Sequence, residues 1–526
     1  MSTETEQIHI EALLNPGIYR HEVGEIQLVE THFSWVILTG KYAYKVKKPL
    51  ELEFLDFSTL ALRKHWCEEE LRLNRRWAPQ LYLDVVPITG SPEQPIIGGA
   101  GTAIEYAIRM RQFPQSALLS AQLDAGALDA DDMRELADMI ADRHGSAPAN
   151  HELCFGGIDA IRKPMLENFL YLEPWLDAEE LAAFRDWTDA ELRRHAELID
   201  QRRRDGYVRR CHGDLHLRNL VRLDDGIVAF DCIEFSEELR TLDVISDLTF
   251  LSMDLIASGR DDLAWALLNR YLEVTGDYDG MQLYGLYHVY HCMIRAKVAA
   301  ILAGERDDPA ERDADLDTML HYCEVARDWI DSPRAGLVLM HGLSGSGKTW
   351  VSSRLSAGLG AIRIRSDVER KRLFGVAEDA STDSPPGEGM YDAGASERTY
   401  ARLLELAASL LSAGHRVLLD ATFSKLAERA RARSIADNES TPVVQVVVEA
   451  GDALIAKRLA AREASATDAS EANAAVLDWQ RARLEPVDEL RETPVVRFEN
   501  HPGVDVATLV AAVDSLLSPR APTLGG

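Results

Sequence analysis

The sequence predicts two parts of different fold class: an α+β region up to about residue 330, then an α/β domain with a parallel sheet. The chain has 526 residues. Three observations predict this division. Strand-like patterns gather near the start and are followed by mostly helical stretches. After residue 336, strands and helices alternate, which is typical of a parallel sheet. Between the parts, residues 331–336 contain Pro and Gly and are predicted to be a linker.

The first part begins with β-structure and becomes helical. Its predicted strands alternate polar and apolar residues or form short apolar runs; they lie at 25–30, 35–38, 42–47, 102–112, 219–223 and 227–230. The last two form a hairpin around the turn Asp224-Asp225-Gly226. Helices are predicted at 59–77 and over most of 116–205 and 240–330. We expect a β-rich lobe at 1–115 and a mostly helical lobe at 116–330.

The second part, residues 337–526, has the βαβ pattern. Strands are predicted at 337–340, 361–365, 416–419 and 443–448, and helices at about 348–358, 396–413 and 425–437. Residues 380–395 and 463–475 are rich in small and polar residues. Two interpretations are open for these segments, linkers or lids over a nucleotide site.

Charge and cysteine usage exclude several classes of protein. Lysine and arginine number 57 and aspartate and glutamate 86, so the net charge is 57 − 86 = −29. This balance excludes a general nucleic-acid coater, because cations supply most non-specific affinity for phosphates, although it allows a local basic groove. The six cysteines form no C-x-x-C pair, so neither a zinc ribbon nor a disulfide framework is expected.

The chain also lacks the usual signals for export. Its first residues have neither a basic nor an apolar stretch, and no run of 18 uncharged apolar residues occurs. We therefore expect a cytoplasmic protein with no membrane contact. The sequence does not determine its oligomeric state.

Residues 342–349, GLSGSGKT, fit the pattern G-x-x-x-x-G-K-[ST] between a predicted strand and a helix. Such a loop turns backbone N–H groups inward around phosphate oxygens, and the helix N-terminus favours anions. The lysine reaches the β- and γ-phosphates, and the threonine holds Mg²⁺. The candidate ATP-binding residues are Gly342, Gly345, Ser346, Gly347, Lys348 and Thr349.

Other polar residues of the second part stand near this loop in the predicted topology. Asp420 ends a strand and is either a Mg²⁺ ligand or a helix cap. Asp367 stands at the carboxyl end of a strand, where it could accept a proton, with Arg370 one helical turn on. Arg458 and Arg462 share a helix face and either neutralise a phosphoryl group or face solvent.

With these motifs, residues 337–520 resemble small P-loop kinases of the gluconate-kinase, zeta-toxin and polynucleotide-kinase type, which include proteins described as AAA family ATPases. The resemblance implies that Asp367 is the catalytic base and that Arg370 clamps substrate or phosphate. It also implies that Arg458 and Arg462 are lid residues. It does not identify the acceptor.

A second set of motifs lies in the first part. Residues 212–219, HGDLHLRN, contain an Asp and an Asn five residues apart, which suits phosphoryl transfer. Asp214 would accept a hydroxyl proton, and Asn219 and Asp231 would hold Mg²⁺. Lys45 lies on a predicted strand, and residues 68–70, all glutamate, lie on the next helix, so one of them could pair with Lys45.

These motifs make residues 20–330 similar to the aminoglycoside-phosphotransferase-like branch of the two-lobed protein-kinase fold. The resemblance implies that Lys45 binds the α- and β-phosphates, with Glu69 as its first-choice partner and Glu70 as the second. Lys47 shares the strand face, so the choice of lysine stays open. No G-x-G-x-x-G loop is present, and Ser34 takes the corresponding place as a candidate phosphate ligand.

The two resemblances together imply a bifunctional ATP- and Mg²⁺-dependent phosphotransferase whose acceptors are hydroxyl groups of small molecules. One alternative is a nucleotide-sensing regulator with little turnover. Another is a polynucleotide 5′-kinase in the second part, which the basic run 363–372 favours and the net charge opposes.

Overall fold

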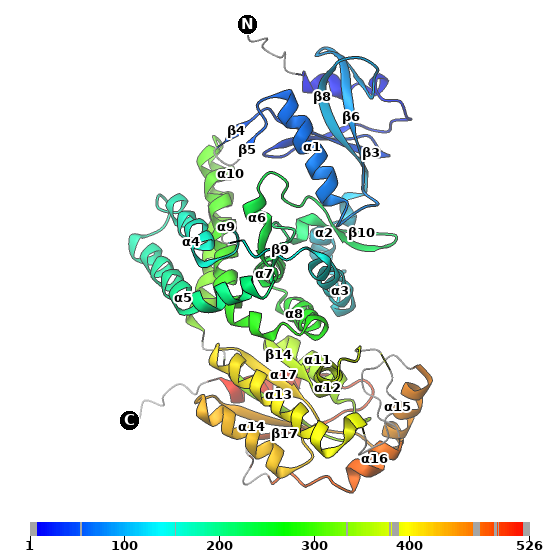
Figure 1. Ribbon diagram of the computed structural model, residues 1–526, viewed down its shortest axis with the longest axis vertical. Coiled ribbons are helices and arrows are strands. Elements are labelled where there is room, and N and C mark those ends of the chain that lie inside the picture. Colours follow the sequence, from blue (N-terminus) through cyan, green and yellow to red (C-terminus); the bar gives the residue numbers. More distant parts are fainter. Residues whose placement is uncertain are drawn as a thin grey trace. The chain divides into compact units, whose positions relative to one another are not determined.

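The computed structural model describes residues 8–52, 55–152, 154–332, 335–377, 380, 389–465, 474–488, 492 and 494–518. The chain forms two compact units (Figure 1). Unit 1 contains the described residues of 1–128, 139–167 and 189–254, and unit 2 contains those of 129–138, 168–188 and 255–526. The division differs from the predicted domains, because helices between 255 and 331 belong to the same unit as the second part of the chain.

Unit 1 contains a six-stranded antiparallel sheet with the order β1-β2-β3-β8-β6-β7. Its strands are β1 (Gln27–Glu30), β2 (Ser34–Leu38), β3 (Tyr42–Lys47), β6 (Tyr82–Ser91), β7 (Gln94–Ile97) and β8 (Ala103–Arg111). The strands β6 and β7 were not among those that the sequence predicted. Both faces of the sheet are buried, because Ala107 and the next residue, Ile108, belong to different core clusters.

Helix α1 (Leu60–Asn74) packs on this sheet through Cys67, in the cluster that also holds Ile108. Three short strand pairs complete the β-structure: β4 (Glu51–Leu52) with β5 (Leu55–Asp56), β9 (Val208–Arg210) with β12 (Thr241–Asp243), and β10 (Leu220–Leu223) with β11 (Gly226–Ala229). The other helices with residues in unit 1 are α2 (Leu119–Asp124), α3 (Ala130–Ser146), α4 (Ile158–Glu167), α5 (Ala178–Arg204), α6 (Glu237–Arg240) and α7 (Val244–Ala257).

Unit 2 is built on a five-stranded parallel sheet with the order β14-β15-β13-β16-β17. The strands are β13 (Gly336–His341), β14 (Ala361–Arg365), β15 (Arg416–Asp420), β16 (Val443–Glu449) and β17 (Val495–Glu499). All but β17 were predicted. The parallel sheet confirms the predicted fold class of this part.

The α-helices that lie wholly in unit 2 number ten among the described residues, including three that precede the sheet in sequence. They are α8 (Asp261–Thr275), α9 (Tyr284–Glu305), α10 (Pro309–Asp331), α11 (Lys348–Leu359), α12 (Ser366–Leu373), α13 (Ala393–Ser412), α14 (Leu426–Asn438), α15 (Asp452–Ser465), α16 (Ala474–Arg481) and α17 (Ala507–Leu517). The core joins Val338 of the central strand to Val351 of α11 and Val513 of α17, each fully buried. The central strand β13 is buried along its whole length, as expected for a parallel sheet covered on both faces.

Within the part of the chain that the structure describes, no helix is both long and apolar enough to cross a membrane. Residues 381–388 and 466–473, which hold much of the two predicted linkers or lids, lie outside the described residues. Residues 333–334 of the predicted linker also lie outside them.

A buried ion pair in α14 leads to a prediction about stability. Arg429 is fully buried, and its Nε lies 2.5 Å from the Glu492 carboxylate. We expect Arg429→Met to destabilise unit 2 by about 3–5 kcal/mol, because it leaves a buried carboxylate without its counter-charge. Differential scanning calorimetry would measure this as a lower unfolding temperature.

Arg431 on the same helix provides the control. It pairs with Glu397 at 2.6 Å, but its side chain is 47% exposed. Arg431→Met should therefore lower the free energy of unfolding by less than about 1 kcal/mol. Equal unfolding temperatures for the two variants would contradict the prediction.

Candidate active sites

The loop between β9 and β10 brings the predicted Asp214 and Asn219 of unit 1 together. The Asn219 amide donates to a carboxylate oxygen of Asp214 at 2.8 Å and to its backbone oxygen at 3.0 Å. His216 Nε2 lies 3.3 Å from the same carboxylate. The Asp214 side chain is 38% exposed, so one face of a fixed carboxylate stays open to a ligand.

His212 ties this loop to the end of strand β11. Its Nε2 lies 3.0 Å from the backbone oxygen of Phe230, which can only accept, so Nε2 carries the proton. Its Nδ1 then accepts from the backbone N–H of Asp214 at 3.4 Å. Burial lowers the pKa of His212, which keeps the ring neutral, as these two roles require.

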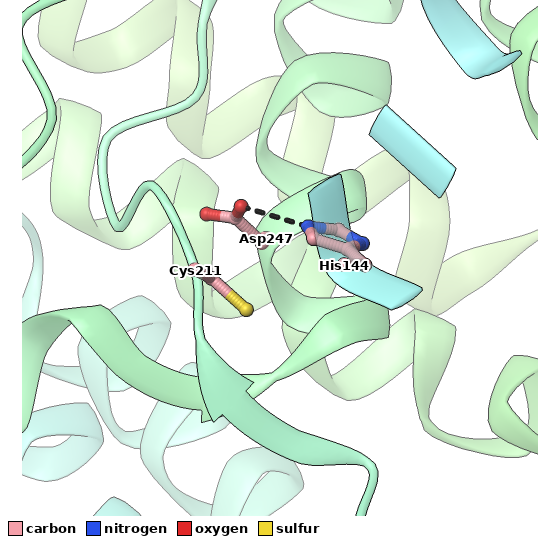
Figure 2. Close-up of side chains that lie close together, drawn as sticks. All are labelled: His144, Cys211 and Asp247. Carbon is pink, nitrogen blue, oxygen red and sulfur yellow. Dashed lines mark hydrogen bonds and ion pairs between the residues drawn. The ribbon is translucent and has the colours of Figure 1, made fainter. Parts of the chain in front are cut away.

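Asp247 on α7 holds the same loop through its carboxylate. Its carboxylate accepts from the backbone N–H groups of His212 at 3.0 Å and of Gly213 at 2.8 Å. It also contacts His144 Nε2 at 3.1 Å, as Figure 2 shows. Burial opposes ionisation, but the hydrogen bond and charge of His144 hold the pKa of Asp247 below its usual value. No local sequence pattern distinguishes this aspartate from an ordinary helix cap.

Asp247 also belongs to a cluster with metal-ligand chemistry. Atoms of His144, Cys211 and Asp247 lie within 4.8 Å of one another. Both oxygens of Asp247 already accept hydrogen bonds, and burial raises the pKa of Cys211 well above its usual value, which disfavours the thiolate. The cluster is therefore explained as a support for the loop.

Asp231, the second predicted Mg²⁺ ligand, follows β11 in a strained backbone conformation. Its φ of +62° is rarely adopted by residues other than glycine. Its N–H donates to the Tyr82 hydroxyl at 3.1 Å, and the next N–H, of Cys232, donates to Asn74 Oδ1 at 2.9 Å. Contacts from β6 and α1 thus fix the turn, and the Asp231 side chain remains 42% exposed.

Lys45 and Glu70 form the ion pair that the sequence left open. Lys45 Nζ lies 2.8 Å from the Glu70 carboxylate and also pairs with Asp231. The first choice, Glu69, is wrong as the partner, because it points away and pairs with Arg72 at 2.6 Å on the helix surface. Adjacent helix residues differ by about 100° in direction, so only one of the two can face the sheet.

Lys47 is more deeply buried than Lys45 and is held by two carboxylates. Its Nζ lies 2.7 Å from Glu70 and 2.5 Å from Glu234, and its side chain is 1% exposed against 12% for Lys45. Burial disfavours the Glu70 carboxylate, but the two lysines outweigh it and lower its pKa to about 2. Only Lys45 therefore reaches Asp231, while Lys47 stabilises the helix from within. Glu234 had no signal in the sequence.

Ser34, the candidate phosphate ligand of unit 1, is buried at the start of β2. It is 1% exposed, and its backbone N–H and C=O are both bonded to Thr31. Its contact with phosphate stays a prediction.

In unit 2, the predicted phosphate loop joins β13 to α11. Its glycines at 342, 345 and 347 all have positive φ angles. A Cβ at Gly342 would lie 2.5 Å from the backbone oxygen of Val448, so only glycine fits there. Ser346 is 1% exposed, and its Oγ has no hydrogen-bond partner among the described residues. A buried, unsatisfied donor in a phosphate loop fits a nucleotide phosphate.

Lys348 and Arg458 both contact the backbone of this loop. Lys348 Nζ donates to the backbone oxygen of Gly342 at 2.7 Å. Arg458 reaches from α15 to the backbone oxygen of Ser346 at 2.8 Å, and Asn500 donates to the same oxygen at 2.9 Å. The predicted lid arginine therefore braces the loop in this structure. The side chain of its predicted partner, Arg462, lies outside the described residues.

Thr349 and Asp420 are linked through Ser352. The Ser352 hydroxyl donates to the Asp420 carboxylate at 2.6 Å and lies 3.1 Å from the backbone oxygen of Thr349. Asp420 ends β15 and is 6% exposed. Asp420 is therefore a carboxylate at the end of a strand beside the phosphate loop, and it does not cap a helix.

A pocket of about 870 Å³ opens beside this loop and contains both Asp367 and Arg370. Arg370 is 7% exposed and donates to the backbone oxygen of Met390 at 2.8 Å. Its guanidinium also lies 5.1 Å from the ring centre of Tyr391, and its Nε has no partner among the described residues. Sequence reasoning missed Glu428 and Arg134, which also line the pocket.

The residues of both sites fit Mg²⁺ and a nucleotide. In unit 1, Asn219 uses its amide nitrogen for Asp214, so its carbonyl oxygen and the half-exposed Asp231 carboxylate are the oxygen ligands that Mg²⁺ prefers. In unit 2, Thr349 and Asp420 line the pocket with the phosphate loop.

Family comparisons agree with both resemblances. Residues 114–284 match the phosphotransferase enzyme family, and residues 337–487 match an AAA domain family. These matches confirm the two predicted kinase-like parts, a phosphotransferase fold followed by a P-loop kinase fold.

Relatives span both parts of the chain. Uncharacterized proteins of Mycobacterium tuberculosis (strain H37Rv) and Mycobacterium bovis are each 29% identical over 469 residues, covering 87% of this chain and 90% of theirs. A choline/ethanolamine kinase family protein from Mesorhizobium loti is 14% identical, covering 59% of this chain and 94% of its own, with a TM-score of 0.37. A putative kinase from Chloroflexus aurantiacus is 17% identical, covering 36% and 100%, with a TM-score of 0.30.

The ion pair of Lys45 leads to a prediction about nucleotide binding in unit 1. In a Lys348→Ala background that removes binding at the phosphate loop, Glu70→Gln should weaken ATP binding on the order of 10-fold to 100-fold, because Lys45 loses the group that orients it. The adjacent Glu69→Gln should have little effect. Isothermal titration calorimetry would measure both, and equal losses would contradict the geometry.

Proposed function

We propose that this chain is a bifunctional ATP-dependent phosphotransferase with two separate Mg²⁺-nucleotide sites. Each site would transfer the γ-phosphoryl group to a hydroxyl of a small molecule. The observation that carries the proposal is the pairing of Lys45 with Asp231 in unit 1, next to the loop of Asp214 and Asn219 that His212 joins to the end of β11. The phosphate loop with its adjoining pocket supports the same chemistry in unit 2.

In unit 1, Asp214 would act as the base. The acceptor oxygen forms a bond to the γ-phosphorus, the bond from that phosphorus to the ADP oxygen breaks, and the hydroxyl proton passes to Asp214. Asn219 and Asp231 would hold Mg²⁺, which neutralises phosphate charge when bound. Lys45, fixed by Glu70, would hold the α- and β-phosphates. The hydrogen bond from Asn219 orients the base before substrate arrives.

In unit 2, Asp367 would accept the proton, since it lies in the first turn of α12 at the carboxyl end of β14 and faces the pocket. Lys348 would bind the transferred phosphoryl group after leaving its contact with the loop carbonyls. Thr349 and Asp420 would hold Mg²⁺. Arg370, buried without an acidic partner among the described residues, would hold an anionic group of the ligand.

Labelled phosphate separates the two activities. The protein would be incubated with γ-labelled ATP, Mg²⁺ and a metabolite extract. We expect Asp214→Ala to slow the formation of one labelled product roughly 10²-fold to 10⁴-fold and to leave the other product unchanged, because only one base is lost. Lys348→Ala should do the reverse.

Two results would contradict this function. One product lost in both variants would mean that a single site performs the transfer. Nucleotide binding with no labelled product from any acceptor would favour a nucleotide-sensing regulator.

A polynucleotide 5′ end is a second candidate acceptor in unit 2. The pocket is lined by eight lysine and arginine residues but only three aspartate and glutamate residues. Trp350 and Trp479 also line it, and aromatic rings of this kind can stack on bases. A cationic, aromatic pocket suits a phosphate-bearing acceptor even though the whole chain is acidic.

A labelling experiment decides between the acceptors. If the pocket accepts polynucleotides, a 5′-hydroxyl oligonucleotide should become labelled at low salt, and labelling should fall as salt rises because phosphate contacts are screened. Lys348→Ala is the control and should abolish labelling. No transfer at low salt would exclude this acceptor.

A further inference from the structure

Helix α8 covers an open edge of the parallel sheet in unit 2. Among the described residues, β14 is the last strand on its side of the sheet, so its outer backbone groups have no neighbouring strand. The Asn269 side chain takes that place. Its amide donates to the backbone oxygen of Ala361 at 3.0 Å, and its Oδ1 accepts from the N–H of Arg363 at 2.7 Å. Asn269 is 4% exposed, so these bonds are shielded from water.

One turn along α8, Glu273 meets the side chain of the same arginine. Glu273 is 1% exposed, and its Oε1 accepts from Arg363 Nε at 3.1 Å and from the Nη2 of that residue. Its Oε2 lies 3.5 Å from Arg365 Nη1. Burial opposes ionisation, but the charges of the two arginines hold the pKa of Glu273 below its usual value. The carboxylate is therefore ionised and anchors both strand arginines.

Arg363 carries this anchor to the phosphate-loop helix. Its Nη1 donates to the backbone oxygen of Thr349 at 3.3 Å and to Ser352 Oγ at 3.4 Å. Ser352 in turn donates to Asp420 at 2.6 Å. A continuous set of buried and part-buried contacts thus runs from Glu273 to the Asp420 carboxylate and to the backbone of Thr349, the two residues that would hold Mg²⁺.

We propose that Glu273 is a positioning residue of the P-loop site, acting through Arg363 on Thr349 and Asp420. The inference rests on the proposed function of that site, because it concerns how Mg²⁺ and nucleotide are held there. Glu273 is not among the residues that line the pocket. It fixes the guanidinium that locks the first turn of α11 against the end of β15.

The proposal gives the two parts of the chain a physical connection. Residues 261–275 lie in the segment that matches the phosphotransferase family, yet they complete a site whose motif lies in the segment 337–487. Arg134, from helix α3 of the same phosphotransferase segment, lines the pocket as well. The P-loop segment alone therefore lacks groups that its site uses.

The test compares Glu273→Gln with Asp262→Asn in the full chain. Asp262 lies on the same helix, but its side chain is 55% exposed and pairs with Arg260, so the control removes one charge without disturbing the site. Calorimetry would measure the binding of a non-hydrolysable ATP analogue with and without Mg²⁺. The difference between each protein and its Lys348→Ala derivative isolates the P-loop site.

We expect Glu273→Gln to weaken Mg²⁺-dependent binding roughly 10-fold to 100-fold, the usual effect of losing a group that orients metal ligands. Binding without Mg²⁺ should change much less, and Asp262→Asn should match the wild type in both. A purely structural role would lower the unfolding temperature and leave the ratio of the two affinities unchanged. That result would overturn the proposal.

Two further variants keep the proposal testable if Glu273→Gln does not fold. Glu273→Asp and Arg363→Lys keep the charges and shorten the reach, so each should shift the Mg²⁺ dependence in the same direction by a smaller factor. Wild-type Mg²⁺ dependence in both would overturn the proposal. If Lys348→Ala removes no nucleotide binding from the wild-type chain, the proposed function of the P-loop site is wrong. That outcome is distinguishable from an effect that is seen only in the Glu273 variants.

Discussion

Three carboxylates with 1% exposure or less, Glu70, Asp247 and Glu273, organise the groups around both candidate sites. A buried charge is costly unless it is paired or hydrogen-bonded. Each of these carboxylates is therefore held in place by its partners and holds those partners in place. Glu70 holds two lysines, Asp247 holds two backbone N–H groups of a loop, and Glu273 holds two arginines. None of the three is a candidate for contact with substrate.

In unit 1, these supports come from elements that are distant in the sequence. The Asp214 loop is held by Asp247 of α7 and, through His212, by the end of β11, while α1 and β6 hold the turn at Asp231. The catalytic groups that we propose therefore stand on a preformed frame. Preorganisation of this kind suits phosphoryl transfer, in which positioning and charge neutralisation supply most of the rate enhancement.

In unit 2, the compact body does not follow the boundaries of the two family matches. The helices α8, α9 and α10 precede the P-loop segment but belong to the same unit. For helix α8 the open edge of β14 supplies a reason, because the backbone groups of a sheet's last strand need partners. Asn269 supplies them, and Glu273 adds charge pairing one turn away. This physical dependence offers a reason for the two parts to be joined in one chain.

The sequence by itself determined the two motif loops, most strands and helices, and the acids at the strand ends. These features are local, since glycine placement, residue spacing and periodicity fix the backbone over a few residues. Only the tertiary structure decided that Glu70 rather than Glu69 pairs with Lys45, because neighbours on a helix point about 100° apart. It also decided between Lys45 and Lys47, which share a strand face and differ in depth. The roles of Glu234, Asp247 and Glu273 depend on partners far along the chain, and no local pattern marks a side chain whose function is to pair with a distant charge.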